Sequence, residues 1–267
     1  MTGRMPTRLG LQHQVIDGFK DYGLPIDEIT LPQKLKAEGY RTVGVGKWHL
    51  GVFKNASLPI NRGFDHFYGY MSGLEDHWTH TVGSHDDPTV PIFLDLRDDN
   101  VIDRTKNGSF GQVVFAEKAV QRIHEHKIYF PGNPLFLYYP LQTVHQPLEA
   151  PDVYRESAAC KSIVNSDRKT FCGMARAADD AIGNVTAALD AAFPGEDVVM
   201  ILSGDNGGLP AAAGNQCPTT NDPRCLRGQK GTFFEGGVRN NALLCSKTLI
   251  PSHRYGTTHS KGLVHVM

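Results

Sequence analysis

Four short polar clusters in the sequence carry side chains that could do chemistry. The first holds Lys47 and His49, which follow the apolar stretch RTVGVG. The others are His145 in TVHQPLEAP, Asp205 and Asn206 in SGDNGG, and Lys230 in LRGQKGTFFEGGVR. Each has an ordinary interpretation when taken alone, because Asp-Asn-Gly-Gly is typical of a turn and single Lys or His residues are common in loops. Taken together, their chemistry is mutually consistent.

The six side chains suit an oxyanion bound beside a hard cation. Asp205 and Asn206 offer oxygen ligands that fit Ca²⁺, or Mg²⁺, better than zinc. Lys47 and Lys230 can each place a positive charge on a sulfate or phosphate oxygen. An imidazole such as that of His145 can protonate a leaving alkoxide, which is worth about 10²–10⁴-fold in rate. The set indicates hydrolysis of an ester of a tetrahedral oxyanion, with sulfate and phosphate both left open.

Each cluster follows a predicted strand or a glycine-rich turn. Strands are predicted over 41–46 and 134–142, and the near-continuous apolar run DVVMILS over 197–203 is typical of a buried strand in a parallel sheet. Helical patterns alternate with these strands. This order predicts one α/β domain with a mostly parallel sheet sandwiched by helices. Because ligands bind outside the carboxyl ends of parallel strands, the clusters are expected along one rim.

Capping and terminating residues mark the ends of the predicted helices. Thr30 is a predicted N-cap, with Pro32 in the first turn and Gly39 as terminator. Ser109 and Gln112 have the spacing of a capping box at the start of a second helix. The polar stretch 75–108 is predicted to be a long irregular excursion over the surface.

Composition excludes several function classes. The chain has 267 residues, of which 40% are hydrophobic and 21% charged, as in an ordinary globular protein. The net charge of -1 gives no global basic field for nucleic acid or an anionic membrane surface. No run of 18 apolar residues predicts a membrane span.

Cysteines and glycosylation sequons favour the secretory pathway. Sequons of the type Asn-x-Ser/Thr occur at Asn55, Asn107 and Asn184. Of five cysteines, two pairs bracket polar loops and are predicted disulfides, namely Cys160 with Cys172 and Cys217 with Cys225. Cys245 lies in an apolar run and is expected to be a buried thiol. The N-terminal residues contain no apolar signal-peptide core, so further sequence is expected upstream.

Six motifs in order resemble the sulfatase family, and most of all its arylsulfatase B-like branch. They are GKWHLG, RGFDHFYGY, YYPLQTVHQPLEAP, IGNVTAAL, ILSGDNGG and LRGQKGTFFEGGVR. The resemblance implies an alkaline-phosphatase-like α/β fold and a Ca²⁺ ion held in part by Asp205 and Asn206. It also implies a nucleophile made from a cysteine by the formylglycine-generating enzyme.

The resemblance also implies roles for the basic residues. Lys47 would hold the formylglycine hydrate and the sulfate, and His49 would assist release of sulfate. His145 and Lys230 would bind the sulfate and protonate the leaving group. The implied substrate is a sulfated sugar or polysaccharide, as for N-acetylgalactosamine-4-sulfatase, in the lysosome or the extracellular space.

The sequence departs from the family pattern at the nucleophile. The family carries a Cys-x-Pro-Ser-Arg segment followed by Leu-Thr-Gly-Arg, and Met1-Thr2-Gly3-Arg4 resembles only the end of this signature. None of the five cysteines lies in such a segment, and Cys217 is followed directly by Pro218. Residues 1–267 are therefore expected to be the central part of a catalytic domain, without the nucleophile segment and a C-terminal subdomain, and to be inactive alone.

Two other functions remain open. A phosphate or phosphonate ester hydrolase could use the same fold with a different anion. A non-catalytic relative could bind sulfated glycans through Lys47, Lys230 and the histidines. An upstream Cys-x-Pro-x-Arg segment favours sulfate, whereas a Ser or Thr there favours phosphate.

Overall fold

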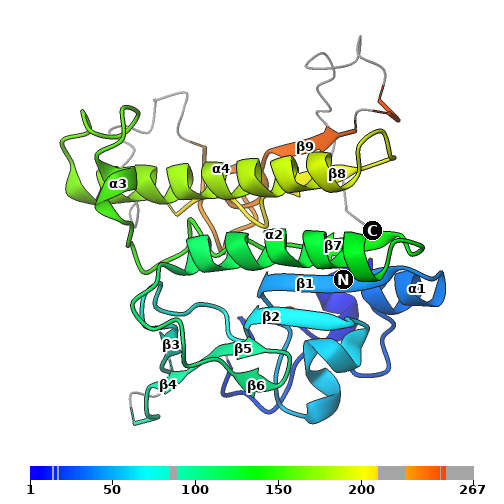
Figure 1. Cartoon of the computed structure of the whole chain (residues 1–267). Coiled ribbons are helices and arrows are strands. Elements are labelled where there is room, and N and C mark those ends of the chain that lie inside the picture. Colours follow the sequence, from blue (N-terminus) through cyan, green and yellow to red (C-terminus); the bar gives the residue numbers. More distant parts are fainter. Residues whose placement is uncertain (14, 17, 85–88, 210–225, 247, 251–267) are drawn as a thin grey trace. The chain divides into compact units, whose positions relative to one another are not determined.

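The computed structural model describes residues 1–13, 15–16, 18–84, 89–209, 226–246 and 248–250 (Figure 1). These residues form two compact units. The first unit comprises Met1–Glu149 and Ala175–Ala188. The second comprises Ala150–Met174 and the described residues from Leu189 onward. No helix in the described ranges is both long and apolar enough to cross a membrane.

A five-stranded mixed sheet forms the centre of the first unit, in the order β6-β5-β2-β1-β7. Its strands are β1 (Arg41–Lys47), β2 (His66–Tyr70), β5 (Leu96–Asp98), β6 (Val101–Ile102) and β7 (Leu135–Tyr138). Strand β1 pairs in parallel with both β2 and β7, whereas β5 pairs antiparallel with β2 and β6. The predicted α/β class is confirmed, and the parallel part of the sheet consists of β2, β1 and the edge strand β7.

Helices and short elements surround this sheet. They are η1 (Pro6–Leu9), α1 (Leu31–Ala37), η2 (Asn55–Ser57), η3 (Pro59–Arg62), β3 (Thr81–Val82), β4 (Phe93–Leu94) and α2 (Gly111–Tyr129). Helix α2 packs beside β1 and β2 (Figure 1). Helix α1 begins as predicted, because Thr30 forms a capping box with Gln33 and Pro32 occupies the first turn.

The capping box predicted for α2 is wrong. The N-cap of α2 is Phe110, with no side-chain cap, instead of Ser109. Gln112 points into the protein, where its Nε2 donates to the hydroxyl of Tyr139 at 2.9 Å and its Oε1 accepts from the hydroxyl of Thr143 at 3.0 Å. These long-range partners replace the local one that the sequence pattern offered.

Apolar side chains cover both faces of β2, which explains why the whole strand is buried. On one face, Phe67 packs with Trp48, Phe64 and Met71 in a core cluster. On the other, the rings of Tyr68 and Tyr70 pack on Phe115 of α2, with centroids 6.2 and 5.9 Å apart. The first unit therefore has a helix-covered sheet, as an α/β fold requires.

The stretch 75–108 is more ordered than predicted. It contributes strands β3 to β6 and buries four ionisable side chains, namely Glu75, His77, His80 and Asp95. Each of these groups makes at least one hydrogen bond within the protein, which offsets part of the cost of burying it.

The second unit has a small antiparallel sheet. Its elements are α3 (Asp152–Arg155), both ends of α4 (Ser166–Ala192), β8 (Met200–Ser203), α5 (Glu235–Val238) and β9 (Ala242–Cys245). The run 197–203 yields a strand, but the prediction that it is buried in a parallel sheet is wrong. Strand β8 pairs antiparallel with β9, and Ile201 is 61% exposed. Both strands of a two-stranded sheet are edges, so each leaves backbone N–H and C=O groups unpaired on its outer side.

The cysteines divide into three cases. Cys160 and Cys172 form a disulfide in the second unit. Cys245 lies on the exposed strand β9, so the expectation of a buried thiol is wrong. The proposed pair Cys217 and Cys225 lies outside the described residues.

Candidate active site

Lys47 and His49 lie where β1 leaves the sheet. Lys47 is the last residue of β1 and pairs with Tyr70, the last residue of β2, so both strands end at the same edge. The backbone N–H of His49 donates to the carbonyl of Met71 at 3.0 Å, and the φ of His49 is 54°. A residue other than glycine in this left-handed backbone conformation costs about 1–3 kcal/mol of strain. Such strained residues are common at functional sites.

The loop after β2 fixes the position of the His49 imidazole. A Cβ atom on Gly73 would lie 2.7 Å from Nε2 of His49, so the ring packs directly against the backbone of this glycine. A larger residue at this position would require the His49 ring to shift. The orientation of the imidazole is therefore set by the neighbouring strand as well as by its own.

The segment after β7 arrives at the same edge. The backbone N–H of Lys47 donates to the carbonyl of Pro140 at 3.3 Å. A Cβ atom on Gly46, whose φ is 116°, would lie 2.1 Å from that carbonyl oxygen. Gly46 thus allows the chain leaving β7 to cross close to β1 and to bring the His145 loop to the end of the sheet where Lys47 lies.

A buried imidazole holds the backbone of His145. Nε2 of His77 donates to the carbonyl of His145 at 3.2 Å, and the backbone N–H of His77 donates to Glu149 at 3.2 Å. The ring of His77 stacks on Phe110, with centroids 5.4 Å apart. Burial lowers the pKa of His77, which favours the neutral ring as the donor to this carbonyl. The side chain of His145 remains half-exposed at the loop surface.

A second buried pair supports the start of this loop. Glu75 and His80 are both fully buried, and Nδ1 of His80 lies 3.3 Å from a carboxylate oxygen of Glu75. Gln142 donates to the same oxygen at 3.3 Å. Burial raises the pKa of Glu75 to about 7. Burial alone lowers the pKa of His80, but the hydrogen bond and charge of Glu75 bring it above its ordinary value.

Sequence reasoning missed these supporting residues. The signal was the short run EDHWTH, in which Glu75, Asp76, His77 and His80 concentrate ionisable groups inside an otherwise irregular segment. The pairing could not be deduced, because the partners Gln142 and His145 lie 67 and 68 residues further along the chain.

In the second unit, the Asp205 turn meets the Lys230 loop. Asp205 and Asn206 follow β8 directly, and the carbonyl of Asn206 accepts from the side chain of Asn240 at 2.7 Å. The backbone N–H of Lys230 donates to the carbonyl of Gly208 at 2.9 Å. Asp205 is exposed, and Asn206 and Lys230 are half-buried. Two of the predicted clusters are therefore neighbours within this unit.

The predicted site residues fall into one set in each unit. The first unit contains Lys47, His49 and His145, and Lys47 contacts Pro140 in the segment that leads to His145. The second unit brings together the turn and the loop that carry Asp205, Asn206 and Lys230. The sequon residues Asn55, Asn107 and Asn184 are all exposed. Their glycosylation stays a prediction.

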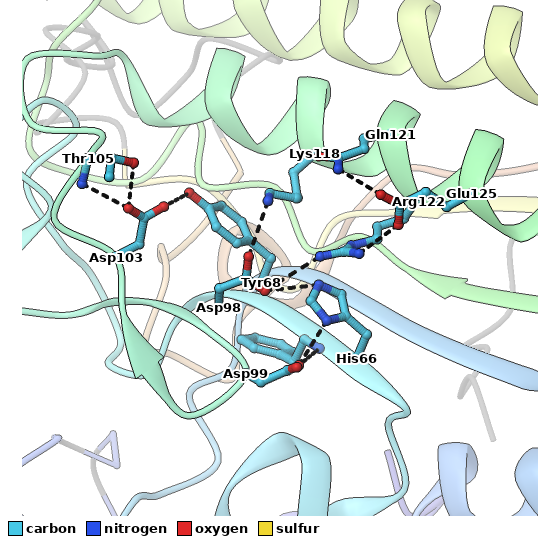
Figure 2. A network of polar contacts seen from close by, with 11 residues as sticks. His66, Tyr68, Asp98, Asp99, Asp103, Thr105, Lys118, Gln121, Arg122 and Glu125 are labelled. Carbon is cyan, nitrogen blue, oxygen red and sulfur yellow. Dashed lines mark hydrogen bonds and ion pairs between the residues drawn. The ribbon is translucent and has the colours of Figure 1, made fainter.

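A third cluster, not predicted from the sequence, has the composition of a metal site. Among the described residues, His66, Asp98 and Asp99 form the one group of three such side chains whose ligand atoms all lie within 4.8 Å of one another (Figure 2). His66 is the first residue of β2, whereas Tyr70, the partner of Lys47, is the last. The cluster is therefore at the opposite end of β2 from Lys47.

Cations of α2 already neutralise this cluster. Lys118 and Arg122 lie 3.2 and 3.5 Å from carboxylate oxygens of Asp98 (Figure 2). His66 lies 3.3 Å from Asp98 and 2.9 Å from Asp99, and burial lowers its pKa. These contacts tie the turn between β5 and β6 to β2 and α2, which is a structural role.

Comparison with known proteins gives a consistent result. A family model described as Sulfatase matches residues 1–267. The chain is 38% identical to arylsulfatase J of Mus musculus over 266 residues, which cover 100% of this chain and 42% of that protein. It is 29% identical to arylsulfatase A of Homo sapiens, covering 91% of this chain and 47% of that protein. The chain thus spans somewhat less than half the length of these curated relatives.

Solved structures show the same fold. Ps i-CgsB in complex with k-i-k-neocarrahexaose matches with a TM-score of 0.79 at 26% identity, covering 94% of this chain and 54% of that one. The PsFucS1 sulfatase from Pseudoalteromonas sp. matches with a TM-score of 0.67 at 22% identity, covering 93% and 51%. The second likeness concerns the fold alone. The two matches, together with the mixed sheet and its helices, confirm the expected alkaline-phosphatase-like α/β fold.

Proposed function

The chain belongs to the sulfatase family, and we propose that it carries the sulfate-binding and proton-donating groups of a sulfuric ester hydrolase that acts on a sulfated sugar. The observation that carries this proposal is the meeting of β1 and the segment after β7 at one edge, where the N–H of Lys47 contacts the carbonyl of Pro140. This contact brings an ammonium and the loop of an imidazole to the same end of parallel strands.

The proposed roles follow from the chemistry of each group. The ammonium of Lys47 attracts a sulfate oxygen, and His49 assists sulfate release from a ring position set by Gly73. When the bond between sulfur and the sugar oxygen breaks, a proton passes to that oxygen from the imidazolium of His145, so that the sugar leaves as an alcohol. Lys230 places a second positive charge on the sulfate.

The proposed metal ligands fit a hard cation. Asp205 supplies an exposed carboxylate and Asn206 an amide oxygen, side by side after β8. This donor set suits Ca²⁺ or Mg²⁺, although Ca²⁺ takes 6–8 oxygens and these two residues supply only part of them. The ion would stabilise negative charge on the sulfate oxygens.

The nucleophile is proposed to be a formylglycine hydrate. None of the five cysteines in this sequence lies in a Cys-x-Pro-Ser-Arg segment. A protein that carries such a segment with these residues would need the formylglycine-generating enzyme as a partner. A substrate of the N-acetylgalactosamine-4-sulfate type is proposed because the motifs of the chain resemble those of the arylsulfatase B-like branch.

The proposed location is the secretory pathway, with the lysosome or the extracellular space as the destination. The disulfide between Cys160 and Cys172 supports an oxidising compartment. The exposure of Asn107 and Asn184 supports glycosylation in the same compartment.

A chimera tests the proposed reaction. Residues 1–267 replace the matching segment of arylsulfatase J of Mus musculus, and release of 4-nitrocatechol from its sulfate ester is measured. We expect turnover that falls at least about 100-fold in Lys47→Ala and in His145→Ala. Lys34→Ala, which removes an exposed lysine of α1, is the matched control and keeps full turnover. A folded chimera that hydrolyses the phosphate ester instead, or that only binds sulfated glycans, would contradict the proposal.

A further inference from the structure

A cavity of about 390 Å³ lies in the first unit, next to the strand ends that carry Lys47 and His49. Its wall includes Met71 and Ser72, which directly follow β2, and Val52 and Lys54, which follow the end of β1. Met71 accepts the hydrogen bond from the backbone of His49, so the cavity adjoins the candidate site. Its size is within the range of small-ligand pockets.

The polar wall of the cavity carries two cations and one buried carboxylate. Lys54 is exposed at the rim, and Arg97 comes from β5. Nε of Arg97 is buried and has no hydrogen-bond partner among the described residues. Asp95 is 2% exposed, and its Oδ2 accepts from the backbone N–H of Ser72 at 2.8 Å. Burial raises the pKa of Asp95, while the charge of Arg97 opposes this rise.

The rest of the wall is apolar and includes an aromatic ring. Leu58 and Phe93 line it, and Phe93 is 39% exposed. The ring of Phe93 is held edge-on by Phe19, with centroids 5.0 Å apart. A pyranose ring suits such a wall, because its C–H face packs on an aromatic ring and its hydroxyl groups donate to a carboxylate. The two cations add a preference for an anionic substituent.

We propose that this cavity is a binding site for an anionic sugar residue, next to the sugar whose sulfate lies at Lys47. The identity of the ligand rests on the proposed function. Arg97 and Lys54 bind the anionic group, Asp95 accepts from a hydroxyl group, and Phe93 packs on the sugar ring. The anionic group is either the carboxylate of a uronic acid or a second sulfate, since both present oxygens to a guanidinium in the same way.

Binding to the full chain tests the proposal without requiring turnover. Isothermal titration compares three disaccharides, one with an unsulfated uronic acid, one with a sulfate on the second sugar, and a neutral one of the same linkage. We expect at least one anionic disaccharide to bind about tenfold or more tighter than the neutral one. Whichever anionic disaccharide binds more tightly identifies the anionic group as a carboxylate or a sulfate.

Variants assign the binding to the cavity. Arg97→Gln is expected to weaken binding of the anionic disaccharide by about tenfold or more, and Lys54→Gln by a smaller factor, because Lys54 is exposed. Arg104→Gln, which removes an exposed arginine shortly after β6, is the matched control and leaves binding unchanged. Equal binding of anionic and neutral disaccharides, or full binding by folded Arg97→Gln, overturns the proposal.

The methyl group of Met71 gives a readout in the unmodified chain. Met71 lines the cavity and is one of six methionines, so its methyl NMR resonance is expected to shift on addition of the anionic disaccharide. Binding that leaves this resonance unchanged overturns the proposal even if the variants fail to fold. The unsulfated uronic acid ligand probes the cavity independently of Lys47, so a failure here is distinguishable from a failure of the chimera to hydrolyse a sulfate ester.

Discussion

Nε2 of the fully buried His77 lies 3.2 Å from the backbone oxygen of His145. The residue proposed to protonate the leaving group is thus held through its backbone, while its own imidazole stays half-exposed. This arrangement separates the two tasks of positioning and proton transfer between two histidines. The neutral state of His77, favoured by burial, keeps the positioning contact independent of the protonation of His145.

Replacement of His77 by Ala is expected to lower the free energy of unfolding by about 1–3 kcal/mol or more, because the carbonyl of His145 loses its donor inside the protein. The pH titration of the His145 imidazole, followed by NMR, should also change as the loop loosens. His124→Ala, on the exposed face of α2, should alter the free energy by less than about 0.5 kcal/mol. An unchanged His145 titration in folded His77→Ala would contradict the positioning role.

The Glu75 and His80 pair predicts that stability falls as pH rises. The pKa of Glu75 is raised from 4.5 to about 7, so the folded state keeps a proton that the unfolded state has released between these values. The raised pKa of His80 acts in the same direction. Its contribution to the free energy of unfolding is complete below pH 6.5 and is lost as the pH rises further. A change from 4.5 to about 7 corresponds to about 3 kcal/mol.

Glu75→Gln should therefore flatten the pH dependence of the free energy of unfolding between pH 5 and about 7, measured by urea titration. Glu117→Gln, on the exposed surface of α2, is the control and should keep the slope of the original protein. An equally steep slope in Glu75→Gln would show that other groups cause the pH dependence.

The sequence predicted those parts of the site that depend on local pattern. Lys47, His49 and His145 follow strands whose apolar runs are visible in the sequence, and the ends of parallel strands necessarily meet at one edge. The burial of Glu75 and His77 was not predictable, because polar residues enter a core only when distant partners satisfy them. Those partners lie more than 60 residues away.

Strand direction and helix capping also depend on distant contacts that the local sequence pattern does not reveal. The run 197–203 was recognisable as a strand, but its antiparallel pairing with β9 depends on a segment about 40 residues later in the chain. The Ser109 and Gln112 pattern matched a capping box, yet Gln112 bonds to Tyr139 and Thr143 instead. A local capping motif does not form where a tertiary contact uses the same side chain.

Gly46→Ala should disturb the crossing of β1 and the segment after β7. The new Cβ would lie 2.1 Å from the carbonyl oxygen of Pro140, at a φ of 116°. We expect a loss of at least about 2 kcal/mol in the free energy of unfolding. Gly132→Ala is the matched control, since no atom lies within 4 Å of its added Cβ and its φ is not in the left-handed region. A similar loss in both variants would contradict the crossing as the cause.

Loss of the disulfide between Cys160 and Cys172 should destabilise the second unit. The bridge closes a loop with a sequence separation of 12, and such a crosslink contributes about 2–4 kcal/mol. Cys160→Ser with Cys172→Ser should therefore lower hydrogen-exchange protection in residues 166–174, the N-terminal part of α4 that belongs to the second unit. Cys245→Ser removes an exposed free thiol and is the control. Unchanged protection in the double variant would argue against a structural role for the bridge.

The 267-residue chain by itself should bind inorganic sulfate without hydrolysing a sulfate ester. Lys47 is proposed to supply charge for the anion, whereas no cysteine of this sequence lies in a Cys-x-Pro-Ser-Arg segment. Isothermal titration should detect sulfate binding that weakens at least about tenfold in Lys47→Ala and stays unchanged in Lys34→Ala. Incubation with 4-nitrocatechol sulfate should release no product above the uncatalysed rate. Steady release by the purified chain would contradict this prediction, and would mean that another group of the sequence provides the nucleophile.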